Sequence, residues 1–172
     1  MKKIILFLFL SFLNFTFCFS QDTIKWYNNR QHSLFVELLG NAFSYYNITY
    51  DCSFKIAEDH KIAIGLGGTF LPLYGEKFYG LNPQINYLYG EEHHHIEIGI
   101  GYYIYWAKYE YKWEIEENYI PMRIGYRYQR DDGGFFWKIA FVLLNGNFYF
   151  WNDSQFIKWG GVAFGYTFKN KK

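Results

Sequence analysis

The sequence of 172 residues lacks the features of a helical, disulfide-bonded or nucleic-acid-binding protein. It contains two cysteines and three prolines, and its 17 basic residues nearly balance its 16 acidic ones. Beyond residue 20, no apolar run is long enough for a membrane-spanning helix, and no helical period is sustained. The charge balance excludes a basic surface for nucleic acid, and the scarcity of proline suits long, uninterrupted strands.

Residues 1–20 have the organisation of a secretory signal peptide. Two lysines follow the first methionine, an apolar stretch runs to Phe19, and Cys18 and Ser20 supply the small residues of a cleavage site. We therefore expect a mature chain of residues 21–172 that folds as one domain. A retained transmembrane anchor and a lipoprotein attached through Cys18 are the alternatives.

Removal of this signal peptide changes the charge and the cysteine content. It leaves 15 basic residues against 16 acidic ones, a formal net charge of −1, and it leaves Cys52 without a second cysteine. An internal disulfide is therefore excluded in the mature chain. Cys52 falls on an apolar stripe, where a free thiol acts as a small hydrophobic side chain.

The sequence is rich in aromatic residues, at 25% of the chain, and its apolar and polar positions alternate. The alternation is clearest around residues 95–105, because isoleucine or tyrosine occupies every second position from Ile96 to Ile104. This period of two predicts strands with one apolar face. Over the whole chain it predicts eight strands, at residues 33–41, 44–55, 61–71, 79–89, 94–106, 118–129, 135–144 and 157–168.

The two faces of these strands predict an all-β fold, an eight-stranded antiparallel transmembrane β-barrel with up-and-down meander connectivity. The outward register of residues 44–55, 118–129 and 157–168 carries no charge, whereas a soluble barrel is apolar inside and polar outside. Charges inside a narrow barrel must pair, which favours a structural salt-bridge network over an ion path. The predicted lumen charge network comprises Glu37, Asp51, Lys55, Glu97, Arg123, Arg127 and Lys138.

The connections between the predicted strands differ in kind. Every second connection is tight and polar, and the others are longer and aromatic, except for a short and weakly defined one near Ala42. We expect the tight set to be periplasmic turns and the long set to be extracellular loops. The tight set lies at residues 57–60, 90–93 and 130–134, and the long set at 72–78, 107–117 and 145–156.

The aromatic residues near the long loops have two interpretations. Amphipathic rings favour a membrane interface, where they form an aromatic girdle. Exposed aromatic loops also suit contacts with lipopolysaccharide, glycan or a protein partner. The candidate residues for loop binding are Trp106, Trp113, Phe148, Tyr149, Phe150 and Trp151.

Two histidine-containing segments are candidates for chemistry. Outer-membrane acyl hydrolases of lipid A carry a His-x-Ser element, but here His32 is directly followed by Ser33, and adjacent strand residues face opposite ways. The run Glu91–His95 has metal-ligand residue types, yet it lies in a short turn, which favours a solvated polar turn. We therefore predict no enzyme activity, no metal site and no cofactor, with a lipid A or phospholipid acyl hydrolase as the alternative.

Two features of the chain resemble known outer-membrane proteins. Residues 159–168 resemble the closing-strand signal recognised by the barrel-assembly machinery, although Lys169–Lys172 follow the final phenylalanine. Residues 35–41, 45–50, 124–129 and 133–136 look like a group of small outer-membrane barrels from Bacteroidota-type bacteria. The resemblance implies a fold and a location in the outer membrane of a Gram-negative bacterium, and no functional residue is carried over from it.

The sequence thus predicts a monomeric, non-enzymatic outer-membrane barrel that is either structural or binds at the surface through its aromatic loops. Its expected partners are outer-membrane lipids, lipopolysaccharide and, during biogenesis, the barrel-assembly machinery, with no nucleic acid.

Overall fold

The alternating segments of the sequence form nine antiparallel strands and one short 3-10 turn. The computed structural model describes residues 30–42, 46–73, 76–109, 112–146 and 156–168, so the predicted signal peptide and cleavage site lie outside the described residues. Within this part of the chain, no helix is long and apolar enough to cross a membrane. The elements are β1 (Arg30–Leu39), η1 (Gly40–Ala42), β2 (Tyr46–Ala57), β3 (His60–Leu73), β4 (Glu76–Tyr89), β5 (His94–Gly101), β6 (Tyr103–Tyr109), β7 (Lys112–Tyr128), β8 (Gly134–Gly146) and β9 (Phe156–Phe168).

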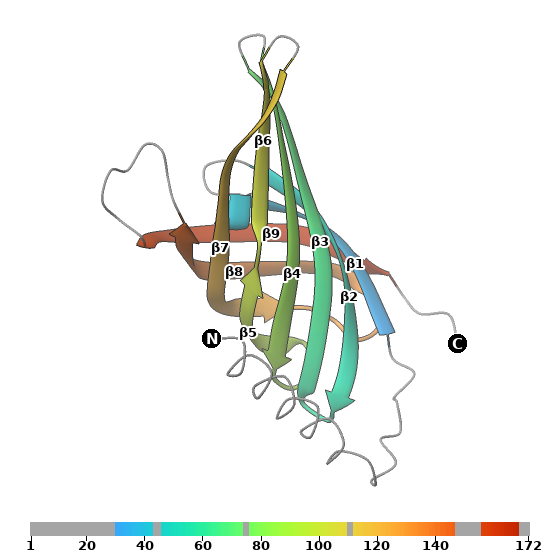
Figure 1. Cartoon of the computed structure of the whole chain (residues 1–172). Helices are drawn as coiled ribbons and strands as arrows, with labels where there is room; N and C mark the ends of the chain where they lie inside the picture. The colour runs from blue at the N-terminus through green and yellow to red at the C-terminus, as the bar shows by residue number, and fades with distance from the viewer. Residues whose placement is uncertain (1–29, 43–45, 74–75, 110–111, 147–155, 169–172) are drawn as a thin grey trace, which may run out of the picture.

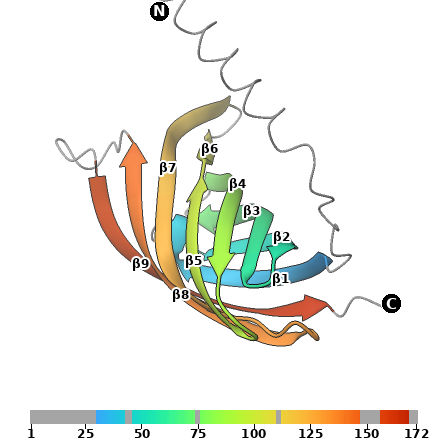
Figure 2. The ribbon, with the colours of Figure 1, turned by 90° about the horizontal axis from the view of Figure 1, so that it is seen from below.

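The strands close into a barrel. Except for β5 and β6, consecutive strands pair antiparallel, and β1 also pairs with β9, from His32 opposite Phe168 to Leu39 opposite Gly161. β5 and β6 both lie between β4 and β7, so together they occupy one of the eight strand positions of the barrel. We call each of these eight positions a stave. Seen from below, the strands follow one another round a ring (Figure 2). The predicted eight-stranded antiparallel meander is therefore confirmed.

The break between β5 and β6 coincides with a proline on each neighbouring strand. The continuous register sets Pro83 of β4 opposite Tyr102 and Pro121 of β7 opposite Gly101. The Tyr102 amide donates to the Pro83 carbonyl at 3.0 Å, but a proline has no N–H to donate in return. Two ladder hydrogen bonds are thus missing at adjacent residues, and the strand predicted as residues 94–106 is interrupted there.

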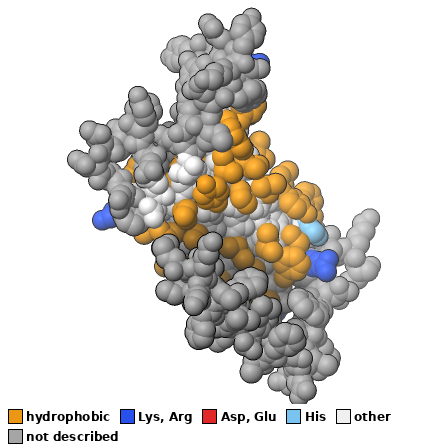
Figure 3. Space-filling model, in the orientation of Figure 1, with side chains coloured by type: hydrophobic (Ala, Val, Ile, Leu, Met, Phe, Trp, Pro, Cys, Tyr) orange, Lys and Arg blue, Asp and Glu red, His pale blue; other side chains and the backbone are white. Residues whose placement is uncertain are grey.

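The side chains have the polarity expected for a barrel in lipid. Outward positions on the strands are mostly large and apolar, as at Ile64, Ile98 and Ile124, which are each more than half exposed. The alternate positions point inward and include the buried polar residues Glu37 and Arg127. In Figure 3, hydrophobic side chains cover the described surface of one side, and no acidic side chain is visible there.

Two of the predicted long loops are wrong. β3 and β4 remain paired to Leu73 opposite Glu76, and β6 and β7 remain paired to Tyr109 opposite Lys112. These strands rise together at the top of Figure 1 as two extended hairpins. Residues 72–78 and 107–117 were predicted as loops because they are long and aromatic, whereas strand pairing needs only backbone groups.

The first connection, predicted as a short loop, turns into the barrel instead. Leu39 and Gly40 have positive φ values of 65° and 52°, which bend the chain inward to the buried turn η1. Tyr119 Oη donates to the Asn41 carbonyl at 2.8 Å, and Asn41 Nδ2 donates to Gln84 Oε1 at 3.0 Å. η1 therefore plugs the loop end of the lumen. It packs there in a cluster of Ala42, Tyr103, Tyr119, Ala140, Val142, Leu144 and Ile157.

Replacing Gly40 by alanine is expected to lower the free energy of unfolding by about 1–3 kcal/mol, the usual cost of a strained left-handed residue. A Cβ at Gly40 would also lie 2.6 Å from Cδ of Glu37. The measurement is denaturant unfolding in detergent micelles. Gly68→Ala is the control, because a Cβ there would meet its nearest atom at 3.8 Å. Equal stability of the two variants would contradict the inward turn.

Candidate functional site

The centre of the lumen contains a network of buried ion pairs. Arg123 Nη1 lies 3.0 Å from Glu37 Oε1 and 3.4 Å from Glu97 Oε1. Arg127 Nη1 lies 2.9 Å from Asp51 Oδ2 and 3.4 Å from Glu97 Oε2. All of these side chains are at most 2% exposed. These charges are therefore removed from solvent and balanced by one another.

Lys138 completes the network and makes it electrically neutral. Its Nζ lies 3.2 Å from Glu97 Oε1, so Glu97 is the one carboxylate of the network that all three cations approach. Three buried bases thereby face three buried acids. Phenylalanine rings flank two of the bases, since Lys138 Nζ lies 4.4 Å from the Phe35 ring centre and the Arg127 guanidinium 4.8 Å from that of Phe136. These cation–π contacts hold the basic heads without adding charge.

Small residues occupy several inward positions of β3 and β5. The inward positions of β3 include Ala63, Gly65 and Gly67, which leave space across a narrow lumen. On β5, a Cβ at Gly99 would lie 1.9 Å from Oδ1 of Asn86 and 3.0 Å from Cγ of Arg123. Glycine therefore leaves room for the side chains of Asn86 and Arg123 on the two neighbouring strands.

Lys55, the seventh residue predicted for the network, lies apart from it. It stands near the turn end of β2, opposite Lys61 of β3, and is only partly buried. The sequence could assign Lys55 to the inward register but not to a level along the barrel axis. The neutral cluster thus comprises the other six predicted residues.

A second polar group closes the turn end of the lumen. Lys61 Nζ lies 2.5 Å from Asp131 Oδ1, across the barrel, and Gln31 Nε2 donates to the carbonyls of Arg130 and Asp131 at 3.1 and 2.9 Å. The turn before β8 is thereby held over the mouth. In the same turn, hydrogen bonds from the Arg130 guanidinium lower the pKa of Asp132. The carboxyl groups of this turn thus face basic partners.

This closing group was missed from the sequence. In the predicted strand 61–71, Lys61 falls on the inward face. This position is the one signal in the sequence that could have indicated a role for Lys61 in the lumen. Asp131 lies in a turn that the sequence presents as solvated, 70 residues from Lys61. Only closure of the barrel brings the two residues together.

His32 and Ser33 do not form a nucleophile and base. Ser33 is buried in the lumen, where Gln129 Nε2 donates to its Oγ at 3.0 Å and the Thr167 hydroxyl lies at 3.1 Å. His32 points outward, with its Nδ1 2.6 Å from Tyr50 Oη. The wall of the barrel separates the two groups, so this histidine cannot take a proton from the serine.

The histidine run 91–95 is likewise divided by the strand. His95 points into the lumen and is buried, whereas His94 points outward and its Nδ1 lies 2.5 Å from Tyr126 Oη. Across the residues that the structure describes, no group of three or more histidine, cysteine, aspartate or glutamate side chains could hold a metal ion.

The aromatic binding candidates have mixed positions. Trp106 lies within β6 opposite Tyr79, and Trp113 lies within β7 opposite Lys108, so both belong to paired strands instead of the expected loop. Residues 148–151 lie outside the described part of the chain.

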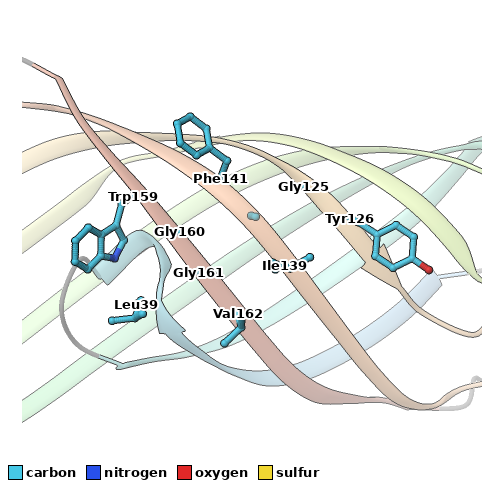
Figure 4. A pocket seen from close by; sticks show the side chains of 10 residues that line it. Leu39, Gly125, Tyr126, Ile139, Phe141, Trp159, Gly160, Gly161 and Val162 are labelled. Atoms are coloured by element: carbon cyan, nitrogen blue, oxygen red, sulfur yellow. The ribbon is translucent and has the colours of Figure 1, made fainter.

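An apolar groove of about 640 Å³ crosses the outer face over β7, β8 and β9. Leu39, Phe141 and Trp159 stand around it, and Gly160 and Gly161 lie along β9 beneath (Figure 4). None of its lining residues is charged. The groove therefore suits hydrocarbon.

Comparison with known proteins finds similarity in fold. No family model matches the chain, and no curated protein matches it. The N-terminal β-barrel domain of OprF from Pseudomonas aeruginosa aligns with a TM-score of 0.49 and 12% identity, covering 81% of this chain and 96% of that one. Ail, the attachment invasion locus protein of Yersinia pestis, solved in complex with the heparin analogue sucrose octasulfate, aligns with a TM-score of 0.44 and 8% identity, covering 81% of this chain and 95% of that one. The fold assignment depends on the closed ladder of strand pairs and not on these likenesses.

Replacing Glu97 by glutamine is expected to lower the free energy of unfolding by about 3–5 kcal/mol, because it leaves three buried cations facing two carboxylates. Denaturant unfolding in micelles, followed by tryptophan fluorescence, measures the change. Glu91→Gln, in an exposed turn, is the control with no expected effect. Adding Lys138→Met to the Glu97 variant is expected to restore part of the loss, and no restoration would contradict the assigned pair.

Proposed function

We propose that this chain is a small integral outer-membrane β-barrel protein of a Gram-negative bacterium, filled by its own side chains and acting without catalysis. Its inside-out polarity carries the proposal. Large apolar side chains occupy the outward positions around the barrel, while the buried polar residues include the six members of the neutral cluster, joined in ion pairs. Burying apolar groups against hydrocarbon and charges against one another satisfies both faces only in a lipid bilayer.

The filled lumen supports a role other than transport. Side chains occupy it at three levels, with η1 and the aromatic cluster at the loop end, the neutral network at the centre, and the Lys61–Asp131 pair at the turn end. Moving an ion past these levels would require breaking buried pairs, which is costly. A scaffold in the membrane, or a surface-binding protein that acts through its loop end, fits this arrangement.

The loop end is the part of the barrel available for such binding. Residues 148–151, Phe-Tyr-Phe-Trp, lie in the sequence between β8 and β9 and combine apolar rings with the polar atoms of Tyr149 and Trp151. Lipopolysaccharide is the partner that this end would meet first at the cell surface. We retain the similarity to small barrels of Bacteroidota-type bacteria as a prediction of origin.

Replacing Ile124 by arginine is expected to lower the free energy of unfolding in lipid vesicles by about 2–4 kcal/mol, because it sets a charge on the outer face near mid-strand. Ile124 is 54% exposed on the outward side of β7. Asn118→Arg, on the same face but six residues nearer the loop end, is the control and is expected to lose about 1 kcal/mol or less. Equal effects would contradict a membrane around the middle of the barrel.

Replacing Phe148 to Trp151 by four serines is expected to abolish binding of the reconstituted barrel to purified lipopolysaccharide, because the rings that contact it are removed. Binding is measured by co-sedimentation with lipopolysaccharide aggregates. Heat-modifiable migration on a gel checks that the barrel still folds. Replacing Glu91 and Glu92 by serine, at the opposite end, is the control. Unchanged binding by the four-serine variant would remove this loop from the proposal and leave the scaffold role.

A further inference from the structure

A repeated ring pair marks the turn end of the barrel's outer face. The side chains His32, His60 and His94 each point outward near the start of a rising strand, and each is hydrogen-bonded through Nδ1 to a tyrosine hydroxyl on the next strand of the barrel. The tyrosine always lies two residues before the one directly opposite the histidine. The three tyrosines are, in the same order, Tyr50, Tyr87 and Tyr126.

The strand pair β8–β9 has a ring pair in the same relative positions, but its rings carry no hydrogen-bonding atoms. Phe135 of β8 lies opposite Tyr166 and stacks on Phe164, two residues earlier, with ring centres 6.3 Å apart. A phenylalanine pair therefore satisfies the packing at this level of the barrel. Ring packing in this arrangement thus does not itself require the polar atoms found at the three histidine positions.

Each His–Tyr pair retains a hydrogen-bond donor for a further group. If the tyrosine hydroxyl donates to Nδ1, the histidine carries its proton on Nε2; if Nδ1–H donates to the tyrosine, the hydroxyl proton is retained. In either tautomer one N–H or O–H remains. His94 is exposed and His60 is half-buried, so an acceptor can approach both from outside the barrel.

The His60 and His94 pairs have two further features in common. A second tyrosine ring packs on each histidine, Tyr89 at 5.1 Å from His60 and Tyr128 at 5.4 Å from His94. An acidic turn also precedes each histidine in the chain, on the side away from the apolar face. These turns contain Glu58 and Asp59 before His60, and Glu91 and Glu92 before His94.

His32 differs on both points. Cys52 lies directly opposite it, and Arg30 occupies the outward position nearer the turn end, over the Phe54 ring at 5.6 Å. A cation thus stands where the other two sites have acids. His32 therefore provides a comparison within the same molecule.

We propose that the His60–Tyr87 and His94–Tyr126 pairs bind phosphoethanolamine headgroups of phospholipids in the leaflet around the turns. Moving from the apolar face towards the turns, a headgroup meets first hydrogen-bond donors and then carboxylates. A phosphoethanolamine lipid presents its groups in that order, acyl chains first, then the phosphate, then a terminal ammonium. The phosphate is thereby matched with neutral hydrogen-bond donors and the ammonium with carboxylates. The inference rests on the proposed membrane location, with the turns on the periplasmic side.

The test follows histidine side-chain nitrogen resonances of the full chain in maltoside micelles. Dioleoylphosphatidylethanolamine is expected to shift the signals of His60 and His94 and to bind about threefold more tightly than dioleoylphosphatidylglycerol, since it adds one exposed ion pair at each site. His32 is expected to respond equally to both lipids. Dioleoylglycerol, which lacks the phosphate, is expected to shift none of them.

Matched variants separate the two halves of each site. His60→Phe and His94→Phe, which introduce the residue type already present at Phe135, are expected to lose the response at the altered site while keeping heat-modifiable migration. Glu91→Gln with Glu92→Gln is expected to reduce binding at His94 to the phosphatidylglycerol level and leave His60 unchanged. Phe135→His with Phe164→Tyr is expected to create a fourth histidine that responds to phosphate-bearing lipids.

Two results would overturn the inference. One is an equal response to dioleoylglycerol or to soluble phosphoethanolamine, which would assign the shifts to hydrocarbon or to a free headgroup. The other is an unchanged preference after the acidic residues are neutralised. A chain that fails to insert into lipid vesicles would instead contradict the proposed function, so failure of the two proposals can be told apart.

Discussion

The carboxylate of Glu97, approached by three cations, is the interaction on which the rest of this barrel depends. A chain that turns its apolar side chains outward must place its charges inside, where an unpaired charge is prohibitively costly. Glu97 lies between Arg123, Arg127 and Lys138, so it links β5 to β7 and β8, and through the arginines to Glu37 and Asp51. One neutral cluster thus ties five staves together.

The narrowness of the lumen explains most of the remaining architecture. Glycine occupies inward positions beside larger inward side chains, as at Gly65 beside Asp51 and Gln84 and at Gly99 beside Asn86 and Arg123, because so narrow a lumen cannot hold a large side chain at every position. The same constraint draws η1 into the loop end and holds Asp131 over the turn end. The lumen is filled by η1 at the loop end, by the charged network at its centre and by the turn before β8 at the turn end. The surfaces left for partners are the outer face of the barrel and its two ends.

Much of the candidate site could be predicted from the sequence because strand parity is a local property. Alternation identified the inward residues of every stave, including all six members of the neutral cluster. It could not place them along the barrel axis, so Lys55 was grouped with residues that lie at another level. Nor could it foresee the Pro83 and Pro121 interruption, since each proline acts on a residue that is distant from it in the chain.

The sequence by itself determined the period of the strands, the identity of their two faces and the requirement that the inward charges pair. Only the tertiary structure decided the partners, such as Lys61 with Asp131 and Glu97 with three cations, and the exterior series of histidine–tyrosine pairs. The physical reason is that a contact across a barrel depends on its closure, tilt and stagger, which belong to all the strands together and to no single segment.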